Sequence, residues 1–76
     1  MIDEMSPTPF YVQLADLLAK RIEDGELEPG QLLPSEAHIQ QQYGVARGTV
    51  RAALKLLRER GLIVTMPQRG SYVRRK

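Results

Sequence analysis

The amino-acid sequence predicts a small α+β domain in which three helices are followed by a C-terminal β-hairpin. Three observations lead to this fold class. Two segments, within residues 9–24 and 47–60, repeat apolar residues at the spacing of one helix face. A shorter helix between them, over residues 35–44, is bounded by a serine and a glycine. Finally, extended stretches at 62–66 and 71–73 flank turn residues, as in a hairpin.

Size and composition indicate one globular domain. A chain of 76 residues buries about 60–65% of its extended surface on folding, and its 42% apolar content is ordinary for such a domain. The absence of cysteine excludes disulfides, thiolate nucleophiles and cysteine-bound zinc, and it suits a reducing cytoplasm. No apolar run approaches the roughly 18 residues of a membrane span, and the acidic start MIDEM is unlike a signal peptide. We therefore expect a cytoplasmic protein.

The charged residues are divided unevenly between the two halves of the chain. Residues 1–44 carry eight acids and two bases, a net charge of −6, whereas residues 45–76 carry nine bases and one acid, a net charge of +8. The total of +2 hides this division. A chain divided in this way is expected to present one positive surface, and such a surface attracts a polyanion.

The first helix is predicted from Pro9 to about Asp24. Thr8 is the expected N-cap, Pro9 suits the first helical position because its missing N–H has no partner there, and Gly25 ends the helix in a left-handed conformation. The predicted buried stripe contains Tyr11, Leu14, Ala15, Leu18 and Ile22. The residues predicted to face water are Gln13, Asp16, Lys20 and Glu23. Nothing in this helix suggests chemistry, so it is interpreted as scaffold.

A connection and a short second helix follow. The connection contains a Pro29–Gly30 turn, and a very short strand is predicted at Leu32–Leu33. Ser35 is the expected N-cap of the second helix, where backbone N–H groups also suit a phosphate, and Glu36 lies in its first turn against the positive helix end. Gly44 then permits the backbone to reverse. The residues predicted to face inward are Ile39 and Tyr43.

The third helix is predicted to carry an apolar stripe and a cationic stripe side by side. The apolar stripe contains Val50, Ala53, Leu54 and Leu57. At 100° per residue, Arg47, Arg51 and Arg58 fall within about 40° of one another, and Lys55 flanks them. A helix, a glycine-containing turn and a second helix with a basic start form the pattern of a helix-turn-helix. In that motif the second helix enters the major groove of DNA.

The C-terminal hairpin is expected to have a basic tip. Its turn, Pro67–Gly70, includes Arg69, and a thin loop of this kind can approach the DNA backbone or minor groove while the arginine reaches in. The alternative interpretation is an ordinary exposed hairpin turn, and the hairpin residues alone leave both interpretations open. We expect the basic helix start and this tip to be held toward the same side of the molecule.

Three motifs follow one another along the chain, PGQLLPSE (29–36), YGVARGTVRAAL (43–54) and ERGLIVTMPQRGSYV (59–73). With these motifs the sequence resembles the N-terminal DNA-binding domain of the GntR family of bacterial transcription regulators. The resemblance covers about residues 7–73, and its opening part is similar to the HutC-like or YtrA-like branches. The resemblance implies a winged helix-turn-helix, with the 62–73 hairpin as the wing.

The resemblance also implies an organisation of the chain. Residues 1–6 are expected to be frayed, residues 7–73 to form the DNA-binding domain, and residues 74–76 to begin a linker to a separate C-terminal effector-binding domain. Members of the family bind inverted-repeat operators as dimers. The expected function is therefore sequence-specific binding of double-stranded DNA as the operator-reading domain of a regulator, a repressor. A homodimer is expected for the full-length protein, and the isolated domain is expected to be mainly monomeric.

Site residues follow from the resemblance and from the charge pattern together. The resemblance implies that Arg47, Thr49 and Arg51 meet base edges or phosphates. It implies a phosphate contact for Ser35 and a place near the minor groove for Gly70. The full predicted DNA-binding set is Ser35, Arg47, Gly48, Thr49, Arg51, Lys55, Arg58, Gln68, Arg69 and Gly70. No catalytic residue, metal or cofactor is predicted.

The chain departs from the family pattern at four positions. Ala37 stands where an arginine usually follows the PSE motif, so one DNA contact is missing, and Gln40 stands where a small alanine is common. Ala46 replaces the usual serine or threonine, which forfeits a capping hydroxyl at a cost of about 1 kcal/mol. Gly48 leaves the backbone bare in the first turn of the reading helix. These departures bear on operator sequence and affinity, and they leave the fold unchanged.

Two other function classes have weaker support in the sequence. A winged helix can serve as a protein–protein interaction module whose basic face binds an acidic partner, because fold does not fix function. Catalysis has little support: His38 is the only histidine, on an exposed helix side, and Glu23 and Asp24 point about 100° apart. The chain has no glycine-rich phosphate loop after a strand and no metal-ligand spacing. We therefore expect a protein that is not an enzyme.

Overall fold

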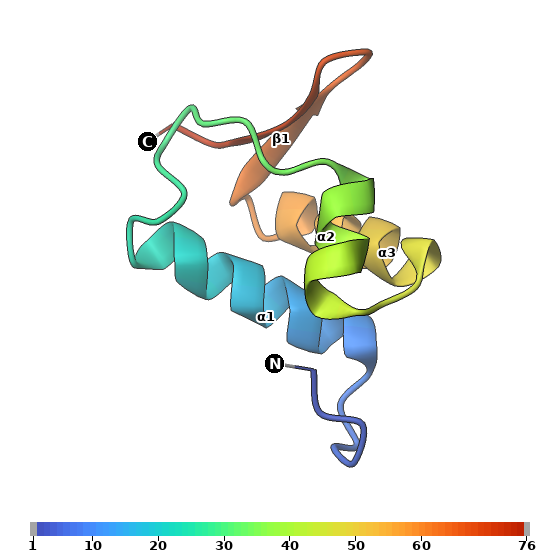
Figure 1. The fold of residues 1–76 in the computed structure, drawn as a ribbon. Helices are drawn as coiled ribbons and strands as arrows, with labels where there is room; N and C mark the ends of the chain where they lie inside the picture. Colours follow the sequence, from blue (N-terminus) through green and yellow to red (C-terminus); the bar gives the residue numbers. More distant parts are fainter. Residues whose placement is uncertain (1, 76) are drawn as a thin grey trace.

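The computed structural model describes residues 2–75 and shows three helices followed by a two-stranded antiparallel sheet (Figure 1). The elements are α1 Phe10–Glu23, α2 Glu36–Tyr43, α3 Arg47–Glu59, β1 Ile63–Met66 and β2 Gly70–Val73. The predicted α+β class, with a winged helix-turn-helix, is thereby confirmed. Met1 and Lys76, which belong to the predicted N-terminal segment and linker, lie outside the described residues. None of the helices within residues 2–75 has the length and apolar content needed to cross a membrane.

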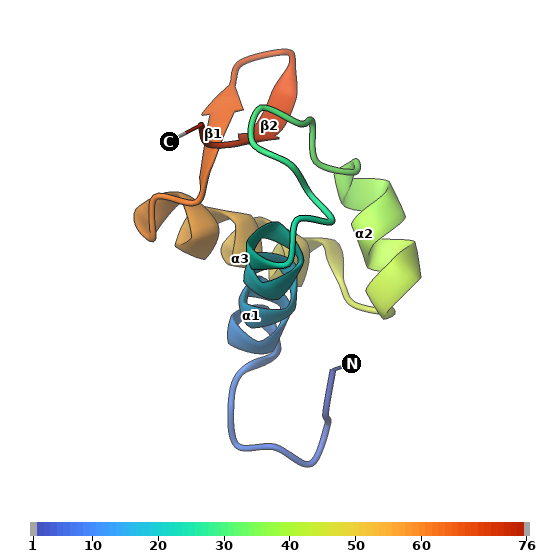
Figure 2. The same cartoon turned by 90° about the vertical axis from the view of Figure 1, so that its left-hand side faces the viewer.

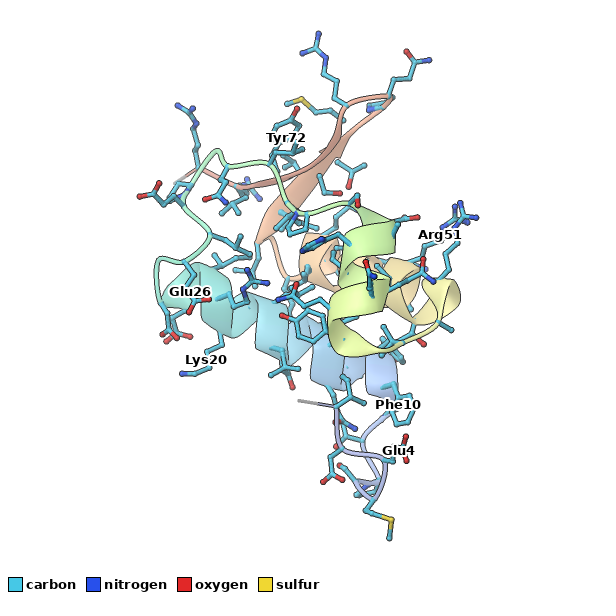
Figure 3. The ribbon with its side chains drawn as sticks, in the orientation of Figure 1. Glu4, Phe10, Lys20, Glu26, Arg51 and Tyr72 are labelled. Carbon is cyan, nitrogen blue, oxygen red and sulfur yellow. The ribbon has the colours of Figure 1, made fainter. Side chains whose placement is uncertain are left out.

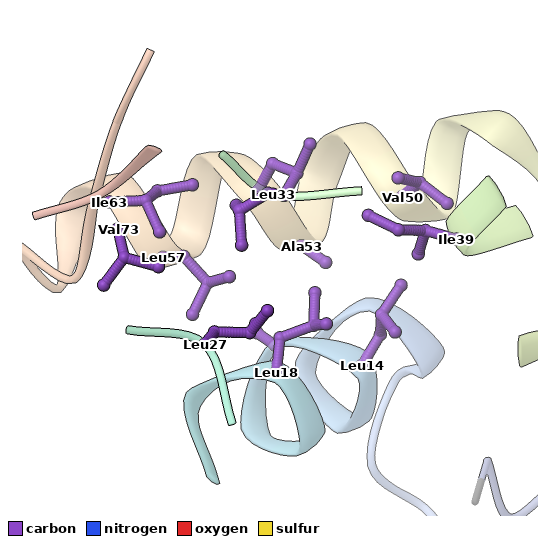
Figure 4. Close-up of a cluster of buried hydrophobic side chains, with 12 residues drawn as sticks. Leu14, Leu18, Leu27, Leu33, Ile39, Val50, Ala53, Leu57, Ile63 and Val73 are labelled. Atoms are coloured by element: carbon purple, nitrogen blue, oxygen red, sulfur yellow. The ribbon is translucent and has the colours of Figure 1, made fainter. Parts of the chain in front are cut away.

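The hydrophobic core lies where α1, α2, α3 and the hairpin meet (Figure 4). Figure 2 looks nearly along α1 and shows α3 crossing behind it, with α2 at the right and the hairpin above the helices. The fully or almost fully buried side chains are Leu14, Ala15, Leu18, Leu27, Leu33, Ile39, Val50, Ala53, Leu54, Leu57, Ile63 and Val73. All four residues of the stripe predicted on α3 are among them, and no polar or charged side chain of residues 2–75 is buried.

The start of α1 differs from the prediction. Pro9, not Thr8, takes the N-cap position, and no side chain caps the helix there. The Pro9 carbonyl accepts the first helical N–H groups, from Val12 and Gln13. Gln13, predicted to face water, is half-buried, and its Nε2 donates to the carbonyls of Thr8 (2.8 Å) and Asp3 (3.0 Å). Its Oε1 also accepts from the Asp3 N–H at 2.7 Å. Tyr11, expected in the buried stripe, is 39% exposed because it lies a turn before the part of α1 that the core covers.

The turn between α2 and α3 has the predicted construction. The Ser35 hydroxyl accepts from the His38 N–H at 3.1 Å and so caps α2, as expected. Gly44 ends α2 in the left-handed region, with a φ of 65°, which allows the chain to reverse. Ala46 then precedes α3 and provides no side-chain cap, as its methyl group requires. These three positions set the angle at which α3 leaves the turn.

The end of α2 is also fixed to α1. Tyr43 packs half-buried against the core beneath the turn, as predicted, and its hydroxyl accepts from Arg21 Nη1 at 3.2 Å. This hydrogen bond, with a smaller contribution from Glu26 at 3.2 Å, raises the pKa of Arg21 against the opposing effect of burial. The contact holds the helix-turn-helix on its scaffold.

The hairpin is joined along β2 by the connection that precedes α2. β1 and β2 pair in the register Ile63↔Val73, Val64↔Tyr72, Thr65↔Ser71 and Met66↔Gly70. On the other side of β2, Leu33 N–H donates to the Ser71 carbonyl (2.8 Å) and Val73 N–H donates to the Gln31 carbonyl (2.9 Å). The very short strand predicted at Leu32–Leu33 is present as a single bridge between Leu32 and Tyr72. The wing therefore has a partner on both edges of β2.

Candidate nucleic-acid interface

The first turn of α3 offers bare backbone and flexible cations to solvent. Arg47 and Gly48 are exposed and Thr49 is half-buried. Gly48 has no internal reason to be glycine, because its φ lies outside the left-handed region and a Cβ there would meet nothing within 4 Å. A glycine in a helix generally costs stability relative to alanine. Glycine at this open position leaves the helix backbone accessible from solvent.

Two of the predicted arginines meet at one carboxylate. Arg51 Nε donates to Glu36 Oε1 at 3.4 Å, and Arg47 Nε lies 3.6 Å from the same oxygen. The three side chains are between 37% and 64% exposed, so they lie at the surface. Figure 3 shows Arg51 projecting from the molecule on the side away from Lys20 and Glu26. Glu36, in the first turn of α2, thus brings the two arginines of α3 together.

Arg58 connects α3 to the wing. Its Nη1 donates to the Thr65 hydroxyl at 2.9 Å, and the Thr65 and Ser71 hydroxyl oxygens are themselves 2.9 Å apart. Thr65 and Ser71 face one another across the two strands of the hairpin. Sequence interpretation placed Arg58 in the cationic stripe and assigned it only to DNA. The structure gives it an additional role, because one end of its guanidinium fixes the wing to the helix.

A hollow lies between the start of α2, the C-terminal half of α3 and the wing, with a volume of about 360 Å³. Its polar lining consists of Ser35, Glu36, Arg58, Thr65, Arg69 and Ser71. Arg58 and Arg69 bring positive charge from α3 and from the hairpin, and the start of α2 adds the positive end of a helix. The hollow therefore lies between Arg58 of α3 and Arg69 of the hairpin tip.

The tip of the wing is a tight, exposed turn. Arg69 N–H donates to the Met66 carbonyl at 3.1 Å, and Gln68 has a φ of 64°. Gly70 has a φ of 114°, and a Cβ there would lie 3.1 Å from Leu32 Cδ1. The hairpin geometry thus already requires glycine at position 70, independently of any ligand. The predicted proximity of Gln68, Arg69 and Gly70 to DNA remains a prediction.

Other cations of the basic half lie elsewhere. Arg60 Nη1 is 2.8 Å from Asp16 Oδ1 on α1. Arg75 lies over the Pro29–Gly30 turn, where its Nε would be 2.6 Å from a Cβ at Gly30. The C-terminal end of the described chain is on the side away from the start of α3 (Figure 1). The prediction of one positive surface is therefore too simple, because tertiary contacts divide the basic residues between two sides.

The structure brings most of the predicted set into one continuous face. Ser35, Arg58, Arg69 and Gly70 line the hollow, and Arg47 and Arg51 adjoin it through Glu36. Lys55 is exposed one turn along α3 from Arg51, and Gln68 is exposed at the wing tip. Glu36 is the site residue that sequence reasoning missed. It was assigned a helix-end role only, since nothing in the sequence places it beside residues 11 and 15 positions away.

This arrangement defines a class of protein. A turn-linked helix pair whose second helix begins with arginines, followed by a hairpin with an arginine at its tip, is a winged helix-turn-helix DNA-binding domain. The model of the family of bacterial regulatory proteins named gntR matches residues 10–73. The chain belongs to this GntR family of bacterial regulatory proteins.

Individual relatives agree in sequence and in structure. The HTH-type transcriptional repressor NagR of Bacillus subtilis is 42% identical over 72 residues, which cover 95% of this chain and 30% of NagR. YtrA from Sulfolobus acidocaldarius, a GntR-family transcription factor, superimposes with a TM-score of 0.91 at 38% identity, covering 100% of this chain and 80% of that one. The DNA-binding domain of AraR in complex with operator ORX1 gives 0.86 at 31% identity, covering 96% and 90%. The chain thus spans less than a third of NagR.

Proposed function

We propose that this domain binds one half-site of an inverted-repeat operator and acts as the operator-reading part of a bacterial repressor. The observation that carries the proposal is the continuous face formed by α3, the hollow and the wing, in a chain that is similar to a repressor and to a domain solved on its operator. We assign DNA binding to residues 7–73 and interpret residues 74–76 as the start of a linker. No comparison favours the alternative of a protein-contact module.

The proposed binding mode gives each part of the face one task. The start of α3 enters the major groove, where the planar forks of Arg47 and Arg51 suit guanine O6 and N7. Thr49 provides a hydroxyl for phosphate or a methyl group for thymine. One phosphate strand crosses the hollow beside Ser35 and Arg58, and the wing tip, with Arg69, reaches toward the minor groove.

The assembly proposed for the full-length protein is a homodimer that forms through a C-terminal domain outside this chain, in the cytoplasm. The domain is proposed to act by binding alone, without cofactor or catalysis. A single copy contacts one half-site, so binding by this chain alone is expected to be weak, and tethering two copies raises it through effective concentration. Nanomolar binding of this chain to a single half-site would contradict that part of the proposal.

The experiment that tests the function is selection of duplexes from a random library by the 76-residue chain, followed by titration at several salt concentrations. The expected result is an enriched half-site, bound more tightly than a scrambled duplex of equal composition. Affinity should fall steeply as salt rises, because counterions are released from the phosphates. Equal binding of the selected and scrambled duplexes, or binding that is insensitive to salt, would refute the proposal.

Replacing Gly48 with alanine should separate stability from binding. The Cβ has open space within the protein, so the free energy of unfolding is expected to rise, by up to about 1 kcal/mol. Binding to the selected duplex is expected to weaken by about 1 kcal/mol, about fivefold, if a phosphate approaches this backbone closely. Urea unfolding and DNA titration of the same preparation measure both quantities. A stabilised variant with unchanged affinity would show that no close approach occurs at Gly48.

Replacing Lys55 with alanine tests a phosphate contact. Lys55 is exposed on α3, and loss of one phosphate contact should reduce the slope of log K against log salt by about one unit for all sequences alike. The matched control is Lys20→Ala, which removes the same charge from α1 on the other side of the molecule (Figure 3). A slope that changes equally in both variants would indicate an effect of net charge alone.

A further inference from the structure

The binding face contains an acid at its centre, and this needs a physical reason. Glu36 Oε1 lies 3.4 Å from Arg51 Nε and 3.6 Å from Arg47 Nε, and Glu36 also borders the hollow. A carboxylate at such a place repels the phosphates that the surrounding cations attract. Its charge suits the positive end of α2, but its exposed ion pairs with the two arginines contribute little to folding and need another explanation.

The atoms in contact suggest what the carboxylate does. Both arginines meet Glu36 through Nε, and within residues 2–75 neither uses its Nη groups in a hydrogen bond to protein. A contact at Nε narrows the orientations of the guanidinium and leaves both Nη groups available to a ligand. Two parallel N–H groups in one plane match guanine O6 and N7, whereas the several oxygens of a tetrahedral phosphate can be reached from more directions. Restricting the arginine planes therefore favours base edges over phosphates.

We propose that Glu36 is a specificity-determining positioning residue, which orients Arg47 and Arg51 for base edges and lowers binding to DNA of other sequence. The inference rests on the proposed function and deepens it. Its two effects have opposite signs, because orientation strengthens binding to the cognate duplex and the negative charge weakens binding to every duplex. A residue that merely supports the fold does not improve binding to random DNA when it is removed.

The test measures Glu36→Ala on two probes, the duplex selected by the wild-type chain and a scrambled duplex of equal composition. Binding to the scrambled duplex should become about two- to fourfold tighter, as expected for removing one screened charge near phosphates. Binding to the selected duplex should become about tenfold weaker, because the arginines lose their fixed planes. The ratio of the two affinities should therefore fall about 20- to 40-fold.

Two further variants separate charge from orientation. Glu28→Ala removes the same charge from the exposed connection before α2 and should leave the affinity ratio unchanged. Glu36→Gln loses the charge but keeps an oxygen that can accept from Nε, so its ratio should fall less than that of Glu36→Ala, about fivefold. It also provides the comparison if Glu36→Ala does not fold, which circular dichroism will show.

The outcomes distinguish this inference from the proposed function. If the wild-type chain itself binds both duplexes equally, the proposed function fails, and the inference fails with it. If the wild-type chain discriminates and a folded Glu36 variant keeps the same affinity ratio, only the inference is overturned. A ratio that falls equally in Glu28→Ala would also overturn it, since that result reflects net charge and not position.

Discussion

Replacing Arg51 with alanine is expected to weaken binding to the selected duplex by about 1–3 kcal/mol, about 5- to 150-fold. Arg51 lies one turn into α3, exposed, with its Nε 3.4 Å from Glu36 Oε1 and with no hydrogen bond from its Nη groups to protein within residues 2–75. If it contacts a guanine, its loss removes two hydrogen bonds and leaves the base edge without partners. Selection repeated with the variant should recover a half-site relaxed at one base pair. Titration by fluorescence anisotropy measures the affinity.

Arg60 provides the matched control for that experiment. Arg60 is the C-cap residue of α3, and its Nη1 donates to Asp16 Oδ1 on α1 at 2.8 Å, outside the proposed DNA-binding face. Arg60→Ala removes the same charge and is expected to change affinity for both duplexes only slightly. Arg51→Lys should recover little of the loss, because an ammonium lacks the planar fork. If Arg51→Ala and Arg60→Ala weaken binding to the selected duplex equally, the proposal that Arg51 recognises a base is wrong.

Replacing Leu57 with alanine is expected to lower the free energy of unfolding by about 2–5 kcal/mol. Leu57 is 0% exposed and lies in the core with Leu18, Ile63 and Val73, where α1, α3 and the hairpin meet. A domain of this size is stable by only about 4–11 kcal/mol, so the cavity removes a large share of the total. Urea unfolding followed by circular dichroism measures the change.

The control for Leu57 is the same substitution at Leu32. Leu32 is 51% exposed beside the wing, so its truncation should cost about 1 kcal/mol or less. Leu57→Ala should also weaken DNA binding at temperatures where part of the protein is unfolded. Full affinity should return on cooling, when the folded fraction recovers. An unfolding free energy reduced by less than about 1 kcal/mol would show that this contact between helices and wing is not the centre of the core.

The parts of the fold that the sequence predicted are those with local causes. The apolar stripe of α3 follows from the spacing of Val50, Ala53, Leu54 and Leu57, and all four are buried. Ser35 caps α2 and Gly44 reverses the chain because each acts on its own neighbours. Hydrophobic periodicity and end signals contain this information without knowledge of the tertiary structure.

The parts that the sequence did not predict depend on contacts between distant residues. The side-chain hydrogen bonds at the start of α1 come from Gln13 and not from Thr8, because residues 3–8 fold back on the helix. Glu36 meets Arg51 fifteen positions away only because α2 and α3 cross at a particular angle. Arg60 turns to α1 and Arg58 to the wing, although both belong to one helix. Charge patterns predict which residues are cationic, but packing decides which of them share a surface.

The double attachment of the wing has a consequence for how a duplex is chosen. Arg58 and the paired hydroxyls of Thr65 and Ser71 fix the hairpin to α3, and the backbone of Gln31–Leu33 fixes its other side. The span from the inserted helix to the hairpin tip is thus set before any DNA arrives. A duplex whose neighbouring grooves are too far apart or too close together must bend or twist to fit. Because flexible base-pair steps deform at a lower free-energy cost than stiff ones, the domain should bind duplexes with flexible steps more tightly, even where those steps contact no side chain.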